Sequence, residues 1–346
     1  MREKFELMGG CSSKLSGVAL KELLESVFQI GSDRKLQDNL FFDRGQDSVR
    51  LSLDEVTSSS LFINTEISPP ISTDENLSAH VAVLNALNDI WVSGGVPTHA
   101  MIQLILDINS EQKQWEIVLE CLSNALAAEN VRIVGGHTML SPSPLLGITV
   151  FGGKRDGWPD ESSLKDGDFI VISKQLTSFQ LRNNLDLGKF LGGRREFDQN
   201  LLLKSNGQSA IELSSIRNFS ATDVSGFGLL GHLSEMLPNG YGANLWRDSL
   251  HALIYDPDAV GFQLADASLP GYINSNFEYS KVLNKTHKNF TNLDKVISCL
   301  PQTNGPILAT CSESDAVKLG AKGFRVIGNI SLTDSIEVIG QNRSPF

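Results

Sequence analysis

Residues 221–236 read ATDVSGFGLLGHLSEM, the most informative stretch of the chain. Thr222 and Asp223 suit a helix N-cap region, because their short side chains can accept backbone hydrogen bonds there. Three glycines follow within the same stretch: Gly226, Gly228 and Gly231. Since glycine inside a helix lowers its stability, we expect either a turn packed tightly against another segment or an ordinary glycine-containing turn. In both cases a helix follows.

On either side of this stretch, apolar residues alternate between helical and strand-like spacing. The spacing predicts helices over residues 16–30, 77–95 and 112–130. It predicts strands over residues 47–53, 60–68, 98–106, 131–137, 145–153, 169–174, 306–310 and 324–330. We expect the strand over 131–137 to end in a glycine turn. The order of these segments indicates an α/β protein.

The polar, turn-rich residues 154–168 predict a boundary between two α/β domains, an N-terminal domain over 1–155 and a C-terminal domain over 165–346. A length of 346 residues suits two domains. Residues 1–15 are expected to be a mobile segment. They contain GGCSSK (9–14), which is either a reactive tip or an ordinary tail.

Composition excludes some classes of protein. A net charge of −11 disfavours nucleic-acid binding, although it allows a nucleotide held through Mg²⁺. The four cysteines are Cys11, Cys121, Cys299 and Cys311. They form no CxxC pair and no zinc-ligand spacing, which indicates a reducing compartment. We expect Cys121, Cys299 and Cys311 to be structural. The sequence shows no secretory signal and no apolar run of about 20 residues, so we expect a cytoplasmic protein without membrane association.

Four carboxylates stand beside turns or at the ends of apolar segments: Asp47, Glu66, Asp89 and Asp223. Asp89 differs from the others because it lies within a mostly apolar helix, where a charge is costly unless a cation or partner meets it. Alternatively, Asp89 lies on an exposed stripe of that helix. Several carboxylates from separate segments would suit Mg²⁺, which prefers hard oxygen ligands.

The stretch IVGGHTM (133–139) follows a strand. Its adjacent glycines, Gly135 and Gly136, would let backbone N–H groups approach a phosphate or ribose, and His137 could then bind a nucleotide. The other interpretation is a tight turn with a structural histidine. The chain contains no GxxxxGK[ST], so the usual P-loop motif is excluded.

Eight segments, in order, resemble the selenophosphate synthetase (selenide, water dikinase) family of the aminoimidazole-ribonucleotide-synthetase-like superfamily. GGCSSK resembles GCGCK of that family, RGQD (44–47) matches its nucleotide-contacting turn, and INTE (63–66) resembles STTD. NALNDIWVSGG resembles NAISDIFAMGG, and VGGHTM matches GGHS. The stretch 221–236 is nearly the family pattern, LPGYINSNF (269–277) resembles PGGTERNF, and LPQTNGP (300–306) resembles DPQTSGG.

The resemblance implies a two-domain fold whose N-terminal domains pair through β-strands in a homodimer. It also implies that ATP, selenide and water give selenophosphate, AMP and phosphate, with Cys11 and Lys14 as catalytic residues and Mg²⁺ as cofactor. The implied metal ligands are Asp47, Asp89 and Asp223. The implied nucleotide contacts are Lys14, Arg44, Gly45, Gln46, Glu66, Asp89, Gly135, Gly136 and His137. The N-terminal segment would act as a mobile lid over the nucleotide.

The chain departs from the family pattern at several positions. Ser13 replaces a second cysteine, Glu66 replaces an aspartate, and residues 300–306 lack the first aspartate and last glycine of DPQTSGG. GGCSSK is also similar to synthetase domains fused to a flavin-dependent oxidoreductase, so a fused or associated oxidoreductase is a possible partner. Two other functions stay open: another ATP-using enzyme of the superfamily, and a non-catalytic nucleotide-binding paralogue.

Overall fold

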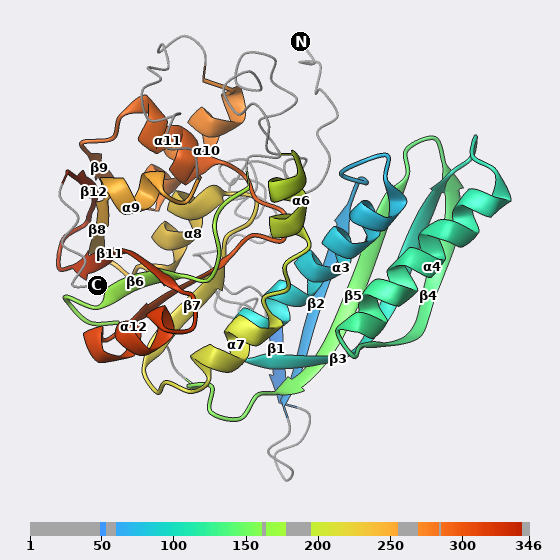
Figure 1. Cartoon of the computed structure of the whole chain (residues 1–346), viewed down its shortest axis with the longest axis horizontal. Helices are drawn as coiled ribbons and strands as arrows, with labels where there is room; N and C mark the ends of the chain where they lie inside the picture. The colour runs from blue at the N-terminus through green and yellow to red at the C-terminus, as the bar shows by residue number, and fades with distance from the viewer. Residues whose placement is uncertain are drawn as a thin grey trace, which may run out of the picture.

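The computed structural model describes residues 49–52, 60–160, 164–177, 195–254, 269–283 and 285–340. Two β-sheets organise them, one of five strands and one of seven (Figure 1). The five-stranded sheet has the order β1-β2-β5-β3-β4. Its strands are β1 (Val49–Ser52), β2 (Ser60–Ser68), β3 (Gly95–Asp107), β4 (Arg132–Ser141) and β5 (Leu145–Lys154). All pairings are antiparallel except the parallel pair β3–β4.

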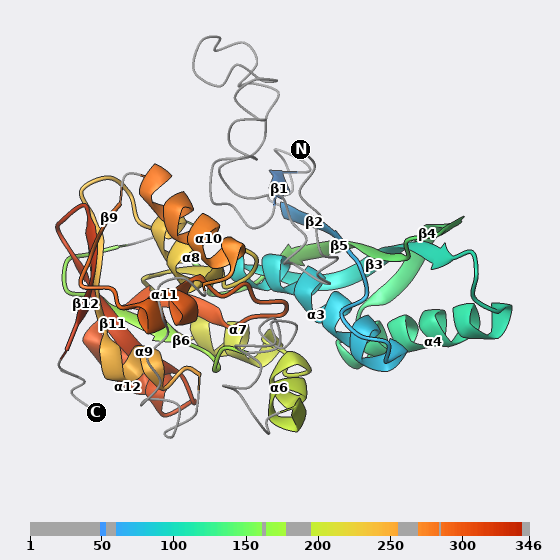
Figure 2. The ribbon, with the colours of Figure 1, turned by 90° about the horizontal axis from the view of Figure 1, so that it is seen from above.

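Helices α3 (Glu75–Val92) and α4 (Gln112–Ala128) lie along the same side of this sheet (Figure 2). Strand alternation explains the burial, because Ile102, Leu104 and Ile148 point to the helices and are almost fully buried. Met101 points the other way and is 37% exposed. No described helix packs on that opposite face of the sheet.

Helix α3 is buried around most of its circumference, with 14 of its 18 residues buried. A helix that is apolar on all sides is expected to lie inside the protein. Leu87 and Ile90 belong to one core that also contains Val171, Phe219 and Ile307 of the second sheet. The helix therefore separates the two sheets and contributes to the packing of both.

The seven-stranded sheet has the order β7-β10-β6-β11-β8-β12-β9. Its strands are β6 (Phe169–Ile172), β7 (Phe219–Asp223), β8 (Gly242–Trp246), β9 (Thr286–Lys288), β10 (Ile307–Cys311), β11 (Arg325–Ser331) and β12 (Ser335–Ile339). Strand β12 runs parallel to both neighbours, and the other pairings are antiparallel. The accompanying helices are α6 (Arg195–Leu202), α7 (Gly207–Leu213), α8 (Gly228–Met236), α9 (Arg247–His251), α10 (Gly271–Val282), α11 (Asn292–Cys299) and α12 (Glu313–Gly320).

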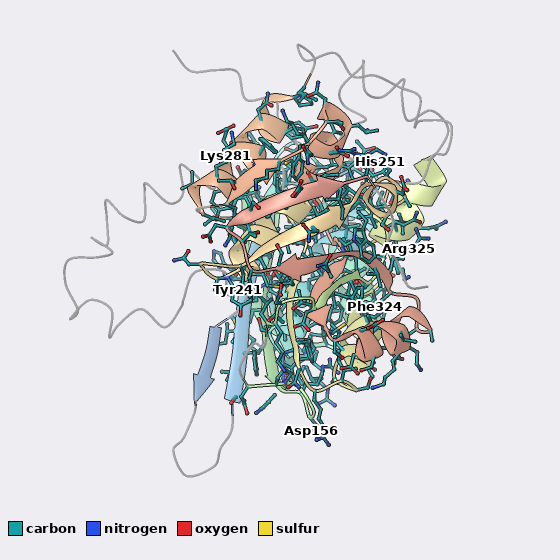
Figure 3. The ribbon with its side chains drawn as sticks, turned by 90° about the vertical axis from the view of Figure 1, so that its left-hand side faces the viewer. Asp156, Tyr241, His251, Lys281, Phe324 and Arg325 are labelled. Atoms are coloured by element: carbon teal, nitrogen blue, oxygen red, sulfur yellow. The ribbon has the colours of Figure 1, made fainter. Side chains whose placement is uncertain are left out.

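A second core lies between this sheet and helices α8, α10 and α11. It includes Ile170 and Ile172 of β6, whereas Val171 between them belongs to the core around α3. Strand β6 thus connects the two cores through its alternating side chains. In Figure 3 this sheet is seen with His251 and Lys281 toward one end and Asp156 toward the other.

Most predicted elements in the described part of the chain are confirmed, with bounds that differ by a few residues. The predicted boundary, residues 154–168, lies between β5 and β6, and two of its residues contact other elements. There, the Arg155 backbone N–H donates to the Gly94 carbonyl at 2.8 Å, and Trp158 meets Phe219 edge to face with ring centroids 4.8 Å apart. The domain division itself stays a prediction. No helix among the described residues is long and apolar enough to cross a membrane.

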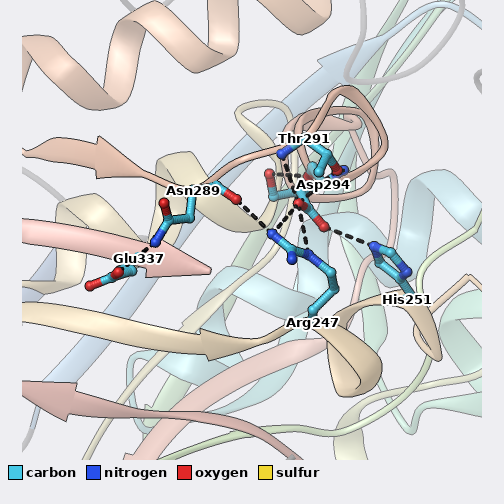
Figure 4. A network of polar contacts seen from close by, with 7 residues as sticks. Arg247, His251, Asn289, Thr291, Asp294 and Glu337 are labelled. Carbon is cyan, nitrogen blue, oxygen red and sulfur yellow. Dashed lines mark hydrogen bonds and ion pairs between the residues drawn. The ribbon is translucent and has the colours of Figure 1, made fainter. Parts of the chain in front are cut away.

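A buried charge fixes α9 and α11 together in the second half of the chain (Figure 4). The Asp294 side chain is fully buried and accepts hydrogen bonds from His251 Nε2 at 2.8 Å, Arg247 Nε at 3.2 Å and Thr291 Oγ1 at 2.7 Å. Arg247 also donates to the Asn289 carbonyl at 2.6 Å. Burial alone would raise the pKa of Asp294, but these hydrogen bonds and the positive charge of Arg247 outweigh burial and lower the pKa to about 2.

This network predicts a pH-dependent stability. The pKa of Asp294 is lowered from 3.8 to about 2 on folding, so its ionised form stabilises the protein by about 2 kcal/mol above pH 4. That contribution is lost as the pH falls toward 2. We expect Asp294→Asn, which cannot titrate, to lower the free energy of unfolding at pH 7, and the deficit relative to wild type to shrink between pH 4 and pH 3. Urea denaturation of the variant and the wild type at each pH measures the free energy of unfolding and the deficit.

Asp160→Asn is the control, because Asp160 forms an exposed pair with Lys154 at 2.7 Å and such pairs contribute little. An Asp294→Asn deficit that stays constant from pH 7 to pH 3 would contradict the assigned pKa shift.

Candidate active site

Asp89 lies in the last turn of α3, close to where the helix meets the second sheet. The Asn64 Nδ2 donates to Asp89 Oδ2 and to the Ala86 carbonyl, the latter at 3.1 Å. The carboxylate of Asp89 is half-buried, so the predicted alternative of an exposed stripe is excluded. A helix C-terminus carries a partial negative charge that disfavours a carboxylate, and the last turn of α3 contains no basic residue. This position therefore favours a cation.

Glu66 lies two residues beyond Asn64 on β2. Because side chains alternate along a strand, Phe62, Asn64 and Glu66 share the face that α3 covers. Phe62 is buried in the core, whereas Glu66 at the far end of the strand is half-buried. The strand thus directs two polar side chains to the same side of the sheet as Asp89.

Asp223 is the last residue of β7 and is 1% exposed. Its predicted place in a helix N-cap region is wrong, because Phe227 is the N-cap of α8 and Asp223 pairs in register with Ile307 of β10. Strand pairing with a segment 84 residues away in sequence overrides the local preference of the Thr-Asp pair for a cap. The carboxylate instead stands at the end of a buried strand.

The glycine turn after Asp223 packs as tightly as predicted. A Cβ on Gly228, whose φ is +70°, would lie 2.7 Å from the Cys299 carbonyl carbon. A Cβ on Gly231 would lie 2.5 Å from the Phe227 Cβ. Asn276 Nδ2 donates to the carbonyls of Gly226 and Cys299, both at 3.0 Å, and so holds the turn against the end of α11.

Gly135, Gly136 and His137 lie within β4, and the predicted glycine turn is wrong. The strand continues through the glycines to Ser141, with a register shift just before them, where the pairing with β3 skips Val134. Gly136 is required by packing, because a Cβ there would lie 2.2 Å from the Ile102 carbonyl oxygen. His137 is exposed on this edge strand.

Within one chain, the structure does not bring these three residues to Glu66. Strands β5 and β3 lie between β2 and β4, which corresponds to a separation of roughly 14 Å across the sheet. The predicted site residues therefore fall into two groups. One group, Asp89, Glu66 and Asp223, lies on α3, β2 and β7. The other group, Gly135, Gly136 and His137, lies on the edge strand β4.

The segment 301–306 connects the strand of Asp223 with α3. The Val224 backbone N–H donates to the Pro306 carbonyl at 2.9 Å, and the Gln302 N–H donates to the Ser225 carbonyl at 2.9 Å. Asn304 has a φ of +49°, which asparagine tolerates better than most residues. Sequence reasoning treated this segment only as a departure from a motif and missed its structural role.

Gly305 permits this close packing, because a Cβ there would lie 1.8 Å from the Val224 carbonyl oxygen. We expect Gly305→Ala to lower the free energy of unfolding by about 3 kcal/mol, since the backbone beside Asp223 must move. Gly153→Ala is the control, because a Cβ there meets nothing within 4 Å. Chemical denaturation measures both variants, and equal stability of the two would contradict the packing.

Lys174, two residues after the end of β6, is a buried lysine that sequence reasoning also missed. Its Nζ donates to the Lys204 carbonyl at 2.6 Å and to the Leu201 carbonyl at 3.4 Å. Burial, helped by the charge of Lys204 and opposed by that of Asp223, lowers the pKa of Lys174 to about 7. A lysine at the end of an apolar strand was the signal available in the sequence.

The remaining predicted residues lie outside the described part of the chain: Cys11, Lys14, Arg44, Gly45, Gln46 and Asp47. Cys299 and Cys311 are buried as predicted, and burial raises the pKa of each thiol to about 12. Cys121 is only half-buried, at the edge of the core, because α4 buries one narrow face.

No three histidine, cysteine or acidic residues of the described segments form a group that could hold a metal ion. The chemistry of Asp89 and Asp223 still fits Mg²⁺, since both supply hard carboxylate oxygens from elements that meet at one place. A substrate phosphate and Asp47 would be needed to complete such a site.

A pocket of about 670 Å³ opens at the other end of α3. Pro69, Ile71, Asp107, Trp115 and Pro144 are among the residues that line it. None of the predicted site residues in the described part of the chain lines this pocket. It is therefore separate from the carboxylates of the candidate site.

Comparison with known proteins agrees with this fold. Residues 44–153 match the family described as AIR synthase related protein, N-terminal domain. A selenide, water dikinase of Sulfurimonas denitrificans is 28% identical over 332 residues, which cover 91% of this chain and 90% of that protein. Another from Pasteurella multocida is 27% identical and covers 96% and 91%.

Among solved structures, AaThiL complexed with AMPPCP and TMP covers 100% of this chain and 97% of that chain, with a TM-score of 0.63 and 16% identity. At this identity the likeness concerns the fold alone. The resemblance to selenophosphate synthetases and the fold of the aminoimidazole-ribonucleotide-synthetase-like superfamily are confirmed.

Proposed function

We propose that this chain, with its AIR synthase related domain, is an ATP-dependent enzyme that converts selenide and water to selenophosphate, releasing AMP and phosphate. The observation that carries the proposal is similarity to selenide, water dikinases over 91% of the chain. The meeting of the Asp89 helix and the Asp223 strand at residues 304–307 supports it. ATP as the substrate is also in keeping with the AMPPCP complex of a protein of the same fold.

Asp89 and Asp223, with Asp47 and Glu66, would hold Mg²⁺, which when bound supplies positive charge against the phosphates of ATP. Without it, an acidic cleft would repel the nucleotide. Asn64 orients Asp89 by donating to its carboxylate, and burial fixes the carboxylate of Asp223 at the strand end. These residues would thus bind the polyphosphate and orient it.

We assign the chemical step to the segment around Cys11 and Lys14. Lys14 would neutralise negative charge on the transferred phosphoryl group. Cys11 would carry or position selenium as a thiolate, which a nearby ammonium favours. Closure of the segment over the nucleotide would exclude water until selenium has attacked.

We also propose that the chain forms a homodimer through the five-stranded sheet. The face opposite α3 and α4 carries no described helix, and large apolar side chains are exposed on strands of this sheet. They are Ile67, Met101, Ile133, Val134, Met139 and Leu140. A partner on this sheet would bring His137 within reach of the other chain's nucleotide. A fused or associated oxidoreductase and a cytoplasmic location stay predictions.

The decisive assay is AMP release from Mg·ATP with and without selenide. We expect release that depends on selenide. Phosphate transfer to a different acceptor, at a rate that does not depend on selenide, would favour another ATP-using enzyme of the superfamily. Nucleotide binding without any turnover would favour a non-catalytic paralogue, and either result would contradict the proposal.

A further inference from the structure

Four asparagines form a buried cluster between α3 and the second sheet, which we call the asparagine cluster: Asn85, Asn88, Asn206 and Asn304. Each is at most 5% exposed. They come from α3, from the N-cap of α7 and from the segment 301–306. A buried amide is costly unless it is hydrogen-bonded, so the cluster requires a specific arrangement of these segments.

The bonds between the amides link these segments directly. Asn85 Oδ1 accepts from the Asn304 backbone N–H at 2.8 Å, and Asn88 Nδ2 donates to Asn304 Oδ1 at 3.3 Å. Asn206 Nδ2 donates to Asn88 Oδ1 at 3.0 Å and to the Gly305 carbonyl at 2.7 Å. Asn304 Nδ2 donates to the Leu202 carbonyl at 2.5 Å.

Two further hydrogen bonds, both made by Ser173, join the cluster to the second sheet. Ser173 Oγ donates to Asn206 Oδ1 at 3.1 Å and accepts from the Ile307 backbone N–H at 2.9 Å. Ile307 in turn pairs with Asp223 in the β7–β10 ladder. These bonds thus run from Asn88, the residue before Asp89, to Ile307, the strand partner of Asp223.

Directional hydrogen bonds fix the relative position of two elements more narrowly than apolar contacts do. Both amides of the Asn88–Asn304 contact are also held from other sides, since Asn88 accepts from Asn206 and Asn304 donates to the Leu202 carbonyl. The contact therefore fixes the distance between α3 and the segment 301–306.

We propose that Asn88 and Asn304 are a positioning pair, which sets the distance between the Asp89 helix and the Asp223 strand for binding a magnesium nucleoside triphosphate. The inference rests on the proposed function for the identity of the nucleotide site. Neither residue needs to touch the nucleotide. Their effect on binding would pass through the two carboxylates.

The test compares Asn88→Ser, Asn304→Ser and the double variant by calorimetric binding of AMPPCP at several Mg²⁺ concentrations. Each single serine is too short to span the contact and leaves one amide without its partner. We expect each single variant to weaken binding about tenfold and to require more Mg²⁺. The double variant removes a contact that each single variant has already broken, so we expect its loss of binding to be close to that of a single variant rather than the sum of the two.

Ser298→Ala is the control for a purely structural role. Ser298 is fully buried in α11 and donates to the Asp294 carbonyl at 2.6 Å, away from the cluster. We expect it to lower the melting temperature without changing nucleotide binding. Single serine variants that lose only thermal stability, like this control, would overturn the proposal. So would additive losses in the double variant.

If a single serine variant does not fold, Ser173→Ala supplies the comparison. It removes the hydroxyl that joins Asn206 to Ile307, and we expect binding about threefold weaker. Unchanged binding in Ser173→Ala would overturn the proposal. This test can fail independently of the proposed function, because AMPPCP binding does not depend on selenide.

Discussion

Asp89→Asn should reduce AMP release from Mg·ATP by about a hundredfold or more while the protein stays folded. The amide keeps the size of the side chain, and its oxygen can still accept the hydrogen bond from Asn64. The substitution removes the negative charge that would hold a metal ion at the C-terminal end of α3. The loss should therefore appear in nucleotide turnover and in Mg²⁺ dependence, with little change in the free energy of unfolding.

Asp74→Asn is a matched control on the same helix. Asp74 caps α3 by accepting from the Leu77 backbone N–H at 3.0 Å, and asparagine caps helices about as well as aspartate. The control makes the same chemical change at the opposite end of α3. Equal AMP release by Asp89→Asn and Asp74→Asn would refute the role of Asp89.

Cys11→Ser and Lys14→Ala should fail in different ways. Serine keeps the size of Cys11 but loses the soft, nucleophilic thiolate, so this variant should bind Mg·ATP and make little selenophosphate. Lys14→Ala removes positive charge beside the transferred group, which typically costs a few kcal/mol of transition-state stabilisation. Its phosphoryl transfer should be impaired whether selenium or water is the acceptor.

AMP release with and without selenide separates these two defects, and nucleotide binding measured beside it shows that the site is intact. A Cys11→Ser variant with the selenophosphate yield of wild type would make the thiol dispensable. GGCSSK would then be an ordinary flexible tail. Equal defects of both variants in the absence of selenide would contradict the division of roles.

Local sequence patterns predicted α3 and most strands, because the apolar run of α3 is too long for a strand and alternation along β3 leaves a periodic signal. They failed where distant segments decide the structure. Asp223 looked like part of a helix cap, yet its pairing with Ile307 places it at the end of a strand. Gly136 looked like part of a turn, yet a close approach to Ile102 explains it.

The candidate site divides in the same way. Asp89 stood out because a carboxylate within an apolar helix needs a physical reason, and the structure excludes plain exposure. The asparagine cluster gave no such signal, because its bonds join residues 85–88 with 206 and 304–305. Only the folded chain shows that the altered motif at 300–306 carries contacts between α3 and the end of β7.

Phosphorus NMR of the wild-type protein with Mg·ATP and selenide tests the central claim most directly. We predict a selenophosphate signal that grows together with AMP and inorganic phosphate, in equal amounts, and that is absent without selenide. Consumption of ATP without a phosphorus–selenium product, or no consumption by a protein that binds the nucleotide, would contradict the account.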